Sequence, residues 1–174
     1  MSRRVARPFE VVGHDPACAE TFSTEKARLA PVFADTTVKI EHVGSTSVPG
    51  LAAKPIIDIC VGLPRLADAE ARVDAMALLG YQYVPEFEAD IPHRRYFRRP
   101  HARPRSHHVH CCVFGDPTWA RHLLFRDYLR GHPDVANEYA ALKQALADRH
   151  RNERLAYTEA KDPFITRILE QVSH

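Results

Sequence analysis

The sequence lacks the features that mark several classes of protein. Its four cysteines form no Cys-x-x-Cys pair, and its apolar run over residues 55–64, which Asp58 interrupts, is far too short to cross a bilayer. No basic segment followed by an apolar one opens the chain, so no signal peptide is visible. We therefore expect a cytoplasmic protein with no membrane span.

The few cysteines do not indicate a disulfide framework or a structural metal site. Cys60, Cys111 and Cys112 lie in apolar runs, and without an export signal we expect reduced, buried thiols rather than disulfides or a zinc site. A chain of 174 residues buries about 70% of its extended surface, so it folds without a disulfide or a metal.

Charge of one sign is not in excess. Lys and Arg number 24 against 22 Asp and Glu, which leaves a net charge of +2 with histidine neutral. This balance argues against bulk nucleic-acid binding and limits any electrostatic footprint to a local site. We expect a flexible basic tail over residues 1–8 and a single domain over residues 9–174.

Hydrophobic periodicity predicts a mixed α+β fold. Strands are expected over residues 37–43, 56–61 and 107–114, all in one sheet, with the small-residue loop 44–50 at one end. The run 56–61 is nearly all apolar, which indicates a central strand covered on both faces. Shorter strands are expected at 81–84 and 95–98.

Helical spacing of apolar residues predicts helices that begin near residues 15, 66, 117, 133 and 155. The second should run to residue 79, and the last should kink or restart at Pro163. The last three helices would form a C-terminal cover over the sheet.

Two candidate groups follow the first two strands. In Gly44-Ser45-Thr46, small residues let backbone N–H groups approach a phosphate and hydroxyls add hydrogen bonds, although a plain tight turn has the same composition. Asp58 is the one charge within its strand. A carboxylate there needs a partner, either a bound cation or a hydrogen-bonding backbone loop.

Histidine and arginine are concentrated in the middle of the chain. His108 and His110 share one face of a strand, where imidazoles can ligate a metal, hold phosphate or simply face solvent. Six arginines nearby could clamp a polyphosphate or form a solvated edge, and they are Arg94, Arg95, Arg98, Arg99, Arg103 and Arg105. Lys161, before a possible helix start, could also reach a phosphate.

The segment EHVGSTSVPGLAAKPIIDI at residues 41–59 resembles the GrpB-like family. The resemblance covers nearly the whole chain, and it continues through RRYF at 94–97, HHVH at 107–110, FRDYLR at 125–130 and YTEAK at 157–161. The resemblance implies the nucleotidyltransferase superfamily, with a fold similar to the polymerase-beta palm. It also implies a link to dephospho-coenzyme A kinase, because relatives of this domain occur fused to that enzyme.

In that superfamily a Gly-Ser pair opens the site, two carboxylates two residues apart hold divalent metal on the next strand, and a third follows later. Gly44-Ser45 match the opening and Asp58 matches one carboxylate. Ile56 and Cys60 stand where the second would be, and histidines stand where the third is expected. This departure argues against ordinary two-metal nucleotidyl transfer.

We therefore expect a nucleotidyltransferase-like α+β protein that binds a nucleotide or another phosphate-containing small molecule. The expected ligand-binding residues are Gly44, Ser45, Thr46, Arg95, His108 and Lys161. The expected ligands for Mg²⁺ or another divalent cation are Asp58, His108 and His110, and Asp58 and His110 are also the expected catalytic residues for nucleotidyl or phosphoryl transfer.

Two other hypotheses remain open from the sequence. The protein could be a non-catalytic module that binds a nucleotide or coenzyme A-type ligand and assists or regulates a partner enzyme. The presence of a single carboxylate favours this hypothesis. It could also hold a transition metal with His108, His110 and Asp58. Arg95 lies in the family-like segment, so we expect it to point into the same cleft as Asp58, while most of the arginines over 98–105 stay in solvent.

Overall fold

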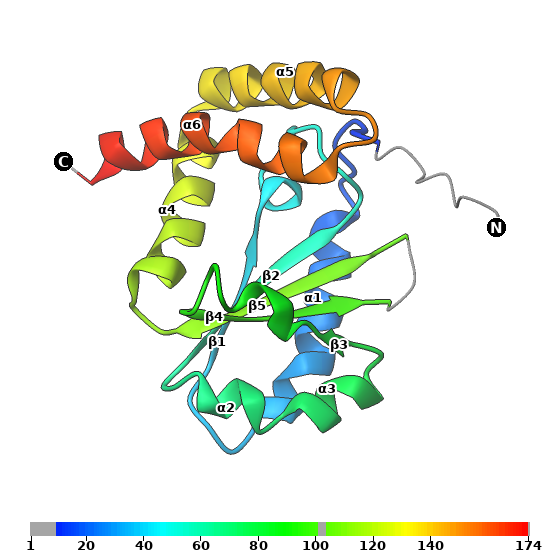
Figure 1. Cartoon of the computed structure of the whole chain (residues 1–174), viewed down its shortest axis with the longest axis vertical. Coiled ribbons are helices and arrows are strands. Elements are labelled where there is room, and N and C mark those ends of the chain that lie inside the picture. The colour runs from blue at the N-terminus through cyan, green and yellow to red at the C-terminus, as the bar shows by residue number, and fades with distance from the viewer. Residues whose placement is uncertain (1–9, 101–103, 174) are drawn as a thin grey trace.

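A five-stranded mixed sheet forms the centre of the structure (Figure 1). The computed structural model describes residues 10–100 and 104–173, so the expected basic tail over 1–8 lies outside the described residues. In sheet order the strands are β1 (Lys39–Val43), β2 (Ile57–Leu63), β5 (His107–Val113), β4 (Arg94–Arg99) and β3 (Gln82–Tyr83). The predicted sheet, with its α+β class, is confirmed.

Strand β2 lies inside the sheet, as its apolar sequence predicts. It pairs with β1 antiparallel and with β5 parallel, and β4 pairs with β5 antiparallel. Because side chains alternate along a strand, the register places Asp58 beside His108 on one face and Ile59 beside Val109 on the other. The two faces of the sheet therefore have different chemistry.

Six α-helices and three short 3₁₀ helices surround the sheet in the described part of the chain. The α-helices are α1 (Cys18–Leu29), α2 (Ala67–Glu70), α3 (Val73–Leu78), α4 (Pro117–Gly131), α5 (Pro133–Arg149) and α6 (Arg154–Val172). The 3₁₀ helices are η1 (Ala30–Phe33), η2 (Ser45–Ser47) and η3 (Pro85–Phe87). Figure 1 shows α5 and α6 at one end of the molecule and α2 and α3 at the opposite end.

The two faces of the sheet are covered by different helices. Leu29 and Phe33 from the α1–η1 segment and Met76 from α3 pack against Ile59 and Val61 on one face. On the other face, Trp119 of α4 packs against Cys60 and Cys112. Helices α5 and α6 pack on α4 and form the predicted C-terminal cover.

Three helix predictions need correction. Helix α1 begins at Cys18, because the Asp15 carboxylate accepts a hydrogen bond from the Ala17 N–H and caps the preceding turn. The segment 66–79 forms two helices, interrupted where Arg72 turns its side chain to the Val32 carbonyl. Helix α6 is one continuous helix through Pro163 and does not restart there.

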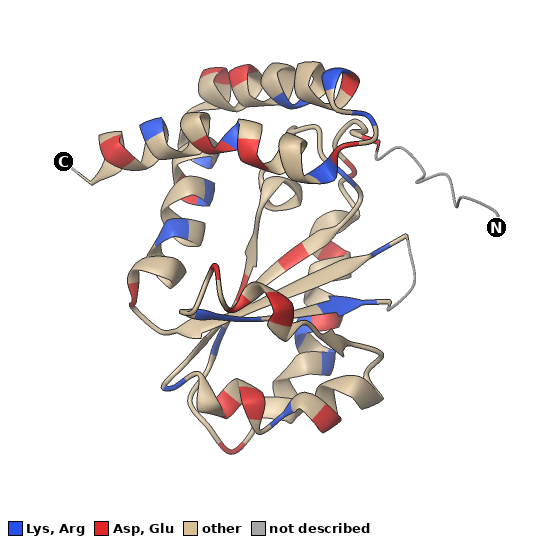
Figure 2. Cartoon of the chain, in the orientation of Figure 1, with Lys and Arg blue, Asp and Glu red and all other residues tan. Residues whose placement is uncertain are grey.

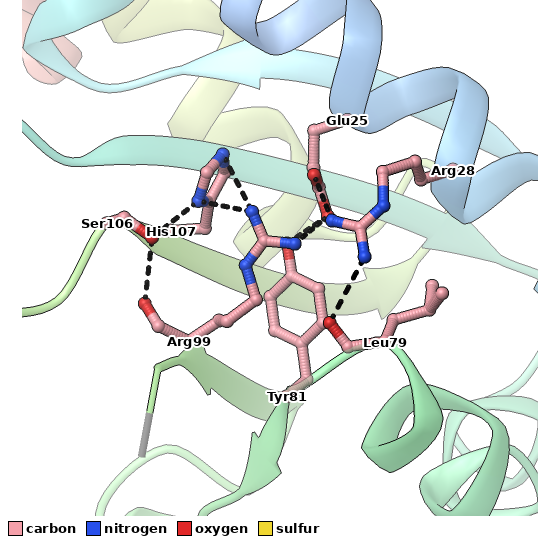
Figure 3. A network of polar contacts seen from close by, with 7 residues as sticks. All are labelled: Glu25, Arg28, Leu79, Tyr81, Arg99, Ser106 and His107. Carbon is pink, nitrogen blue, oxygen red and sulfur yellow. Dashed lines mark hydrogen bonds and ion pairs between the residues drawn. The ribbon is translucent and has the colours of Figure 1, made fainter. Parts of the chain in front are cut away.

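A polar network connects α1 to the sheet face that it covers, the face opposite Asp58 (Figure 3). The carboxylate of Glu25, only 2% exposed, lies 2.9 Å from Arg28 and 3.0 Å from Arg99 and accepts a hydrogen bond from the Tyr81 hydroxyl. Arg99 also contacts the ring of His107. Since Arg99 stands on β4 and His107 on β5, these contacts hold the helix and two strands together.

Acidic and basic residues are interspersed along α4, α5 and α6 (Figure 2). Over residues 10–100 and 104–173, no helix combines the length and the apolar character that a membrane span requires.

Candidate functional site

The loop after β1 passes directly over Asp58. Gly44 has φ +70°, and a Cβ at this position would lie only 2.8 Å from Asp58 Oδ2. Glycine is therefore required both by the backbone conformation and by the close approach. The Ser47 hydroxyl donates to the Gly44 carbonyl at 2.5 Å and closes the turn that Ser45 begins.

Thr46, an expected ligand-binding residue, makes contacts within the fold. Its hydroxyl lies 2.9 Å from His42 Nε2 and donates to the Ile56 carbonyl at 3.3 Å, and the residue is buried. The side chain therefore connects the loop to the start of β2. Burial lowers the pKa of His42 to about 4, with Arg130 and Arg126 acting in the same direction and Asp58 opposing them.

Asp58 is held between two histidines. Its Oδ1 lies 3.3 Å from His108 Nδ1 and 3.2 Å from His110 Nε2, and 30% of its side chain remains exposed. Although burial acts to raise the pKa of Asp58, hydrogen bonds from the two histidines hold it far below its usual range. The carboxylate is therefore ionised and reachable by a ligand. This juxtaposition of Asp58, His108 and His110 agrees with the expectation.

Further side chains of the same sheet face complete the surroundings of His110. Tyr96 stacks on the His110 ring at 5.3 Å, and Arg94 Nη1 lies 3.4 Å from His110 Nδ1. With Nδ1 accepting from Arg94, Nε2 carries the proton that His110 donates to Asp58. His122 of α4 lies 5.0 Å from His110 between ring centroids, and burial lowers its pKa to about 3.

The placement of Arg95 is a correction. Arg95 pairs with Cys111 in the β4–β5 register, so its side chain lies on the opposite face from Asp58, where Nε is 2.6 Å from Glu70. Alternation along β4 places Arg94, its neighbour in sequence, on the site face instead. We therefore remove Arg95 from the site.

The expectation that the later arginines stay in solvent was also wrong for those described. Arg98 donates to Gln82 at 2.8 Å, Arg99 pairs with Glu25, and Arg105 donates to the Pro100 carbonyl at 2.6 Å. Arg98 and Arg99 both belong to β4, which extends one residue beyond the strand expected over 95–98. Arg103 lies outside the described residues.

Three lysines gather where the loop meets the helical cover. Lys143 of α5 is 3% exposed and donates to Ser45 Oγ at 2.8 Å and to the Ala52 carbonyl. Lys54 and Lys161 place their Nζ atoms 4.2 and 4.5 Å from the centroid of the Tyr157 ring. Sequence reasoning did not select Lys143, which contacts Ser45, or Lys54, which shares the Tyr157 ring with Lys161.

Burial acts on two members of the lysine cluster, which is defined as Lys54, Lys143 and Lys161, and repulsion by the other two lysines acts on Lys143. Burial lowers the pKa of Lys143 to about 7, with Lys161 and then Lys54 acting in the same direction and Asp58 opposing them. Burial also lowers the pKa of Lys161, against the attraction of Asp58 and Asp162. A signal for Lys143 existed in the sequence, because it is a charged residue at helical spacing from Tyr139 and Leu146.

Metal-ligand distances select a different group from the predicted one. Among the described residues, the one group of three His, Cys, Asp or Glu side chains with all ligand atoms within 4.8 Å of one another is Cys60, Cys112 and His122. Both His108 and His110 contact Asp58, but the three together do not meet this spacing. Their role as ligands of one metal stays a prediction.

Known proteins resemble this chain over most of its length. UPF0157 protein YqkA of Bacillus subtilis is 43% identical over 91% of this chain, which spans 46% of that relative's length. A dephospho-CoA kinase of Mycolicibacterium paratuberculosis is 30% identical over 94% of this chain, and again 46% of the relative is covered. The chain therefore spans about half the length of these two curated relatives.

Solved structures show the same fold. The crystal structure of conserved protein GrpB from Enterococcus faecalis matches with a TM-score of 0.85 and 37% identity, covering 93% of this chain and 96% of that one. The Cid1 poly(U) polymerase bound to MgGTP matches with a TM-score of 0.55 and 12% identity, covering 79% and 45%. The second likeness shows a nucleotidyltransferase-like fold. A sequence model of the GrpB protein matches residues 8–171, and the chain belongs to the GrpB family.

Proposed function

We propose that the protein binds a nucleotide, or a related small molecule with several phosphate groups, between the 44–47 loop and helices α5 and α6. One observation carries this proposal: the buried ammonium group of Lys143 donates to Ser45 Oγ, with two further lysines close enough to lower its pKa. A multiply charged anion at this position would offset the repulsion among the three lysines. The loop would add backbone N–H groups and the Ser45 hydroxyl.

The fold supports the nucleotide part of the proposal. Gly44-Ser45 follow β1 and Asp58 stands on β2, where the resemblance to the nucleotidyltransferase superfamily implies a phosphate loop and a carboxylate. The similarity to dephospho-CoA kinases adds a second ligand class to test, the coenzyme A-type nucleotides. Both classes present phosphates beside an adenine or another base.

The residues present do not fit the pair of Mg²⁺ ions used in two-metal transfer. Mg²⁺ prefers oxygen ligands in octahedral geometry, whereas Asp58 is flanked by two imidazoles and its neighbour on the same face is Cys60. Imidazole ligands suit transition metals better. Metal-free binding of the phosphates by lysine is therefore the function that this geometry supports best.

The alternative is metal-dependent nucleotidyl or phosphoryl transfer, and the partly exposed Asp58 carboxylate is the observation that favours it. The two functions predict opposite effects of Asp58→Asn. If a cation links Asp58 to the phosphates, the variant loses metal-dependent ligand binding. If the phosphates bind to lysine alone, removing a nearby negative charge strengthens binding.

The test measures binding of ATP, UTP, coenzyme A and tripolyphosphate by calorimetry, with EDTA, Mg²⁺ or Mn²⁺. We expect metal-free binding of at least one ligand, weakened at least tenfold by Lys143→Met. Lys26→Met on the exposed side of α1 is the matched control and should bind as the parent does. Equal binding by the parent and the Lys143 variant would refute the proposed site.

A further inference from the structure

Cys60, Cys112 and His122 form a second side-chain cluster, in which Cys60 is two residues along β2 from Asp58 and on the same face. Cys60 is on β2, Cys112 on β5 and His122 on α4, and their ligand atoms all lie within 4.8 Å of one another. Both cysteines are 0% exposed. Bonds of about 2.3 Å to sulfur and about 2.0 Å to nitrogen keep the ligands of one zinc ion within about 4.6 Å, so these atoms need little adjustment.

The fold brings the three residues together by packing rather than by sequence spacing. In the parallel β2–β5 register, Cys112 stands opposite Gly62, two residues along β2 from Cys60 and on the same face. Gly62 has no side chain, and a Cβ there would lie 2.8 Å from the Trp119 ring. The close approach of Trp119 brings His122, one turn further along α4, to the two thiols.

His122 is available to bind an ion. Within residues 10–100 and 104–173 its ring contacts the His110 ring, but it makes no hydrogen bond or ion pair. The same is not true of His108 and His110, which are both engaged with Asp58. An imidazole without a hydrogen bond therefore lies close to two buried thiols, and imidazole nitrogen and thiolate sulfur are the ligands that zinc prefers.

We propose that Cys60, Cys112 and His122 bind a thiophilic divalent ion of the zinc class. Binding converts the two thiols to thiolates and releases two protons, and the 2+ ion with two thiolates leaves an uncharged centre. An uncharged centre suits a position between the sheet and α4, since a net charge there would be costly to bury. The ion would fasten α4 to β2 and β5, independently of the phosphate site.

The test titrates reduced, metal-free protein with Co²⁺, which reports thiolate ligands through an intense sulfur-to-metal charge-transfer absorption, and then displaces it with Zn²⁺. We expect this absorption with one equivalent of Co²⁺ and its loss on adding Zn²⁺. Cys60→Ser and Cys112→Ser should each reduce it and lower zinc affinity at least tenfold. His122→Gln should lower zinc affinity to a similar extent while two thiolates remain.

Cys111→Ser is the matched control. Cys111 is equally buried and adjacent to Cys112 in sequence, but it lies on the opposite face of the sheet, opposite Arg95. Its substitution should leave the absorption unchanged. Absence of the charge-transfer absorption in the parent protein would overturn the proposal even if a variant failed to fold, and so would an absorption that survives both cysteine substitutions.

Discussion

Lys143 combines burial with the neighbourhood of other cations. Its ammonium group has two acceptors, the Ser45 hydroxyl and the Ala52 carbonyl, and it lies 4.9 Å from the Tyr139 ring centroid. These contacts do not balance the loss of water, and its pKa falls to about 7. The side chain therefore titrates near neutral pH, and a bound anion would favour the protonated form.

We predict that phosphate binding takes up a proton above pH 7. The anion raises the pKa of Lys143, so affinity should fall as pH rises above 7, by up to about tenfold per pH unit until the pKa of the bound state is passed. Calorimetry in buffers of different ionisation enthalpy measures the uptake. Lys143→Met serves as the baseline and corrects for the titration of the phosphate itself. Equal uptake by the parent and this variant would assign the proton to another group.

The same lowered pKa predicts a dependence of stability on pH. Between pH 7 and 10 the unfolded chain binds a proton at Lys143 that the folded chain does not, so the stability of the parent relative to Lys143→Met should rise with pH. The steepest slope for one proton is about 1.4 kcal/mol per pH unit. Urea denaturation of both proteins at several pH values measures it. A flat difference would mean that the ammonium group is better solvated than its burial indicates.

Single side chains mark the limit of prediction from sequence. Asp58 could be selected because a charge in an apolar strand is conspicuous, and His108 and His110 because alternation places them on one face. Arg94 and Arg95 could not be separated without the sheet register, since one step along β4 changes the face. Lys143 could not be connected to Ser45, because that contact joins residues 98 positions apart.

At the scale of elements, the packing of α4 on the sheet depends on the absence of a side chain at Gly62. We predict that Gly62→Ala destabilises the protein by about 1–3 kcal/mol, because the added Cβ would lie 2.8 Å from Trp119 and force α4 outward. Gly131→Ala at the end of the same helix meets no atom within 4 Å and should be neutral or slightly stabilising. Urea denaturation compares the two. Similar stabilities would mean that Trp119 can rotate away at little cost.

On the opposite face, the Glu25 network holds α1 against β4 (Figure 3). We predict that Glu25→Ala destabilises the protein by about 3–5 kcal/mol, because it leaves the Arg99 charge and the Tyr81 hydroxyl without their buried partner. Glu20→Ala on the exposed side of α1 should change stability by less than about 0.5 kcal/mol. Chemical denaturation measures the free energy of unfolding of both variants. Equal losses of stability would show that the buried carboxylate adds no net stability.

The elements themselves could largely be predicted, because strand alternation and helical spacing are local properties. The split between α2 and α3 could not; it falls at Arg72, whose side chain contacts the carbonyl of Val32, 40 residues away, and no local pattern shows such a contact. For the same reason the proximity of Cys60, Cys112 and His122 was invisible. No local spacing connects two strands and a helix that meet only after folding.

At the scale of the whole molecule, residues 44–53 join the sheet to the helical cover. Val48 and Leu51 are buried among Leu129, Tyr139 and Ile168 of α4, α5 and α6. Arg130 donates to the Ser47 carbonyl at 2.9 Å, and Lys143 contacts the same segment. A ligand between the loop and the lysine cluster would therefore bridge two layers of the molecule.

We predict that phosphate-ligand binding slows hydrogen exchange in the 44–53 segment, α5 and α6, but not in α2 and α3. With ligand at about 100 times its Kd, amides that exchange only when the bound site opens should slow by about 100-fold. Helices α2 and α3 are short and lie at the other end of the molecule (Figure 1), so their amides exchange by local opening that the ligand does not oppose. Exchange measured by mass spectrometry with tripolyphosphate tests this pattern, with Lys143→Met as the control that should show little protection. Protection centred on α2 and α3, or an unchanged α5, would place the ligand elsewhere.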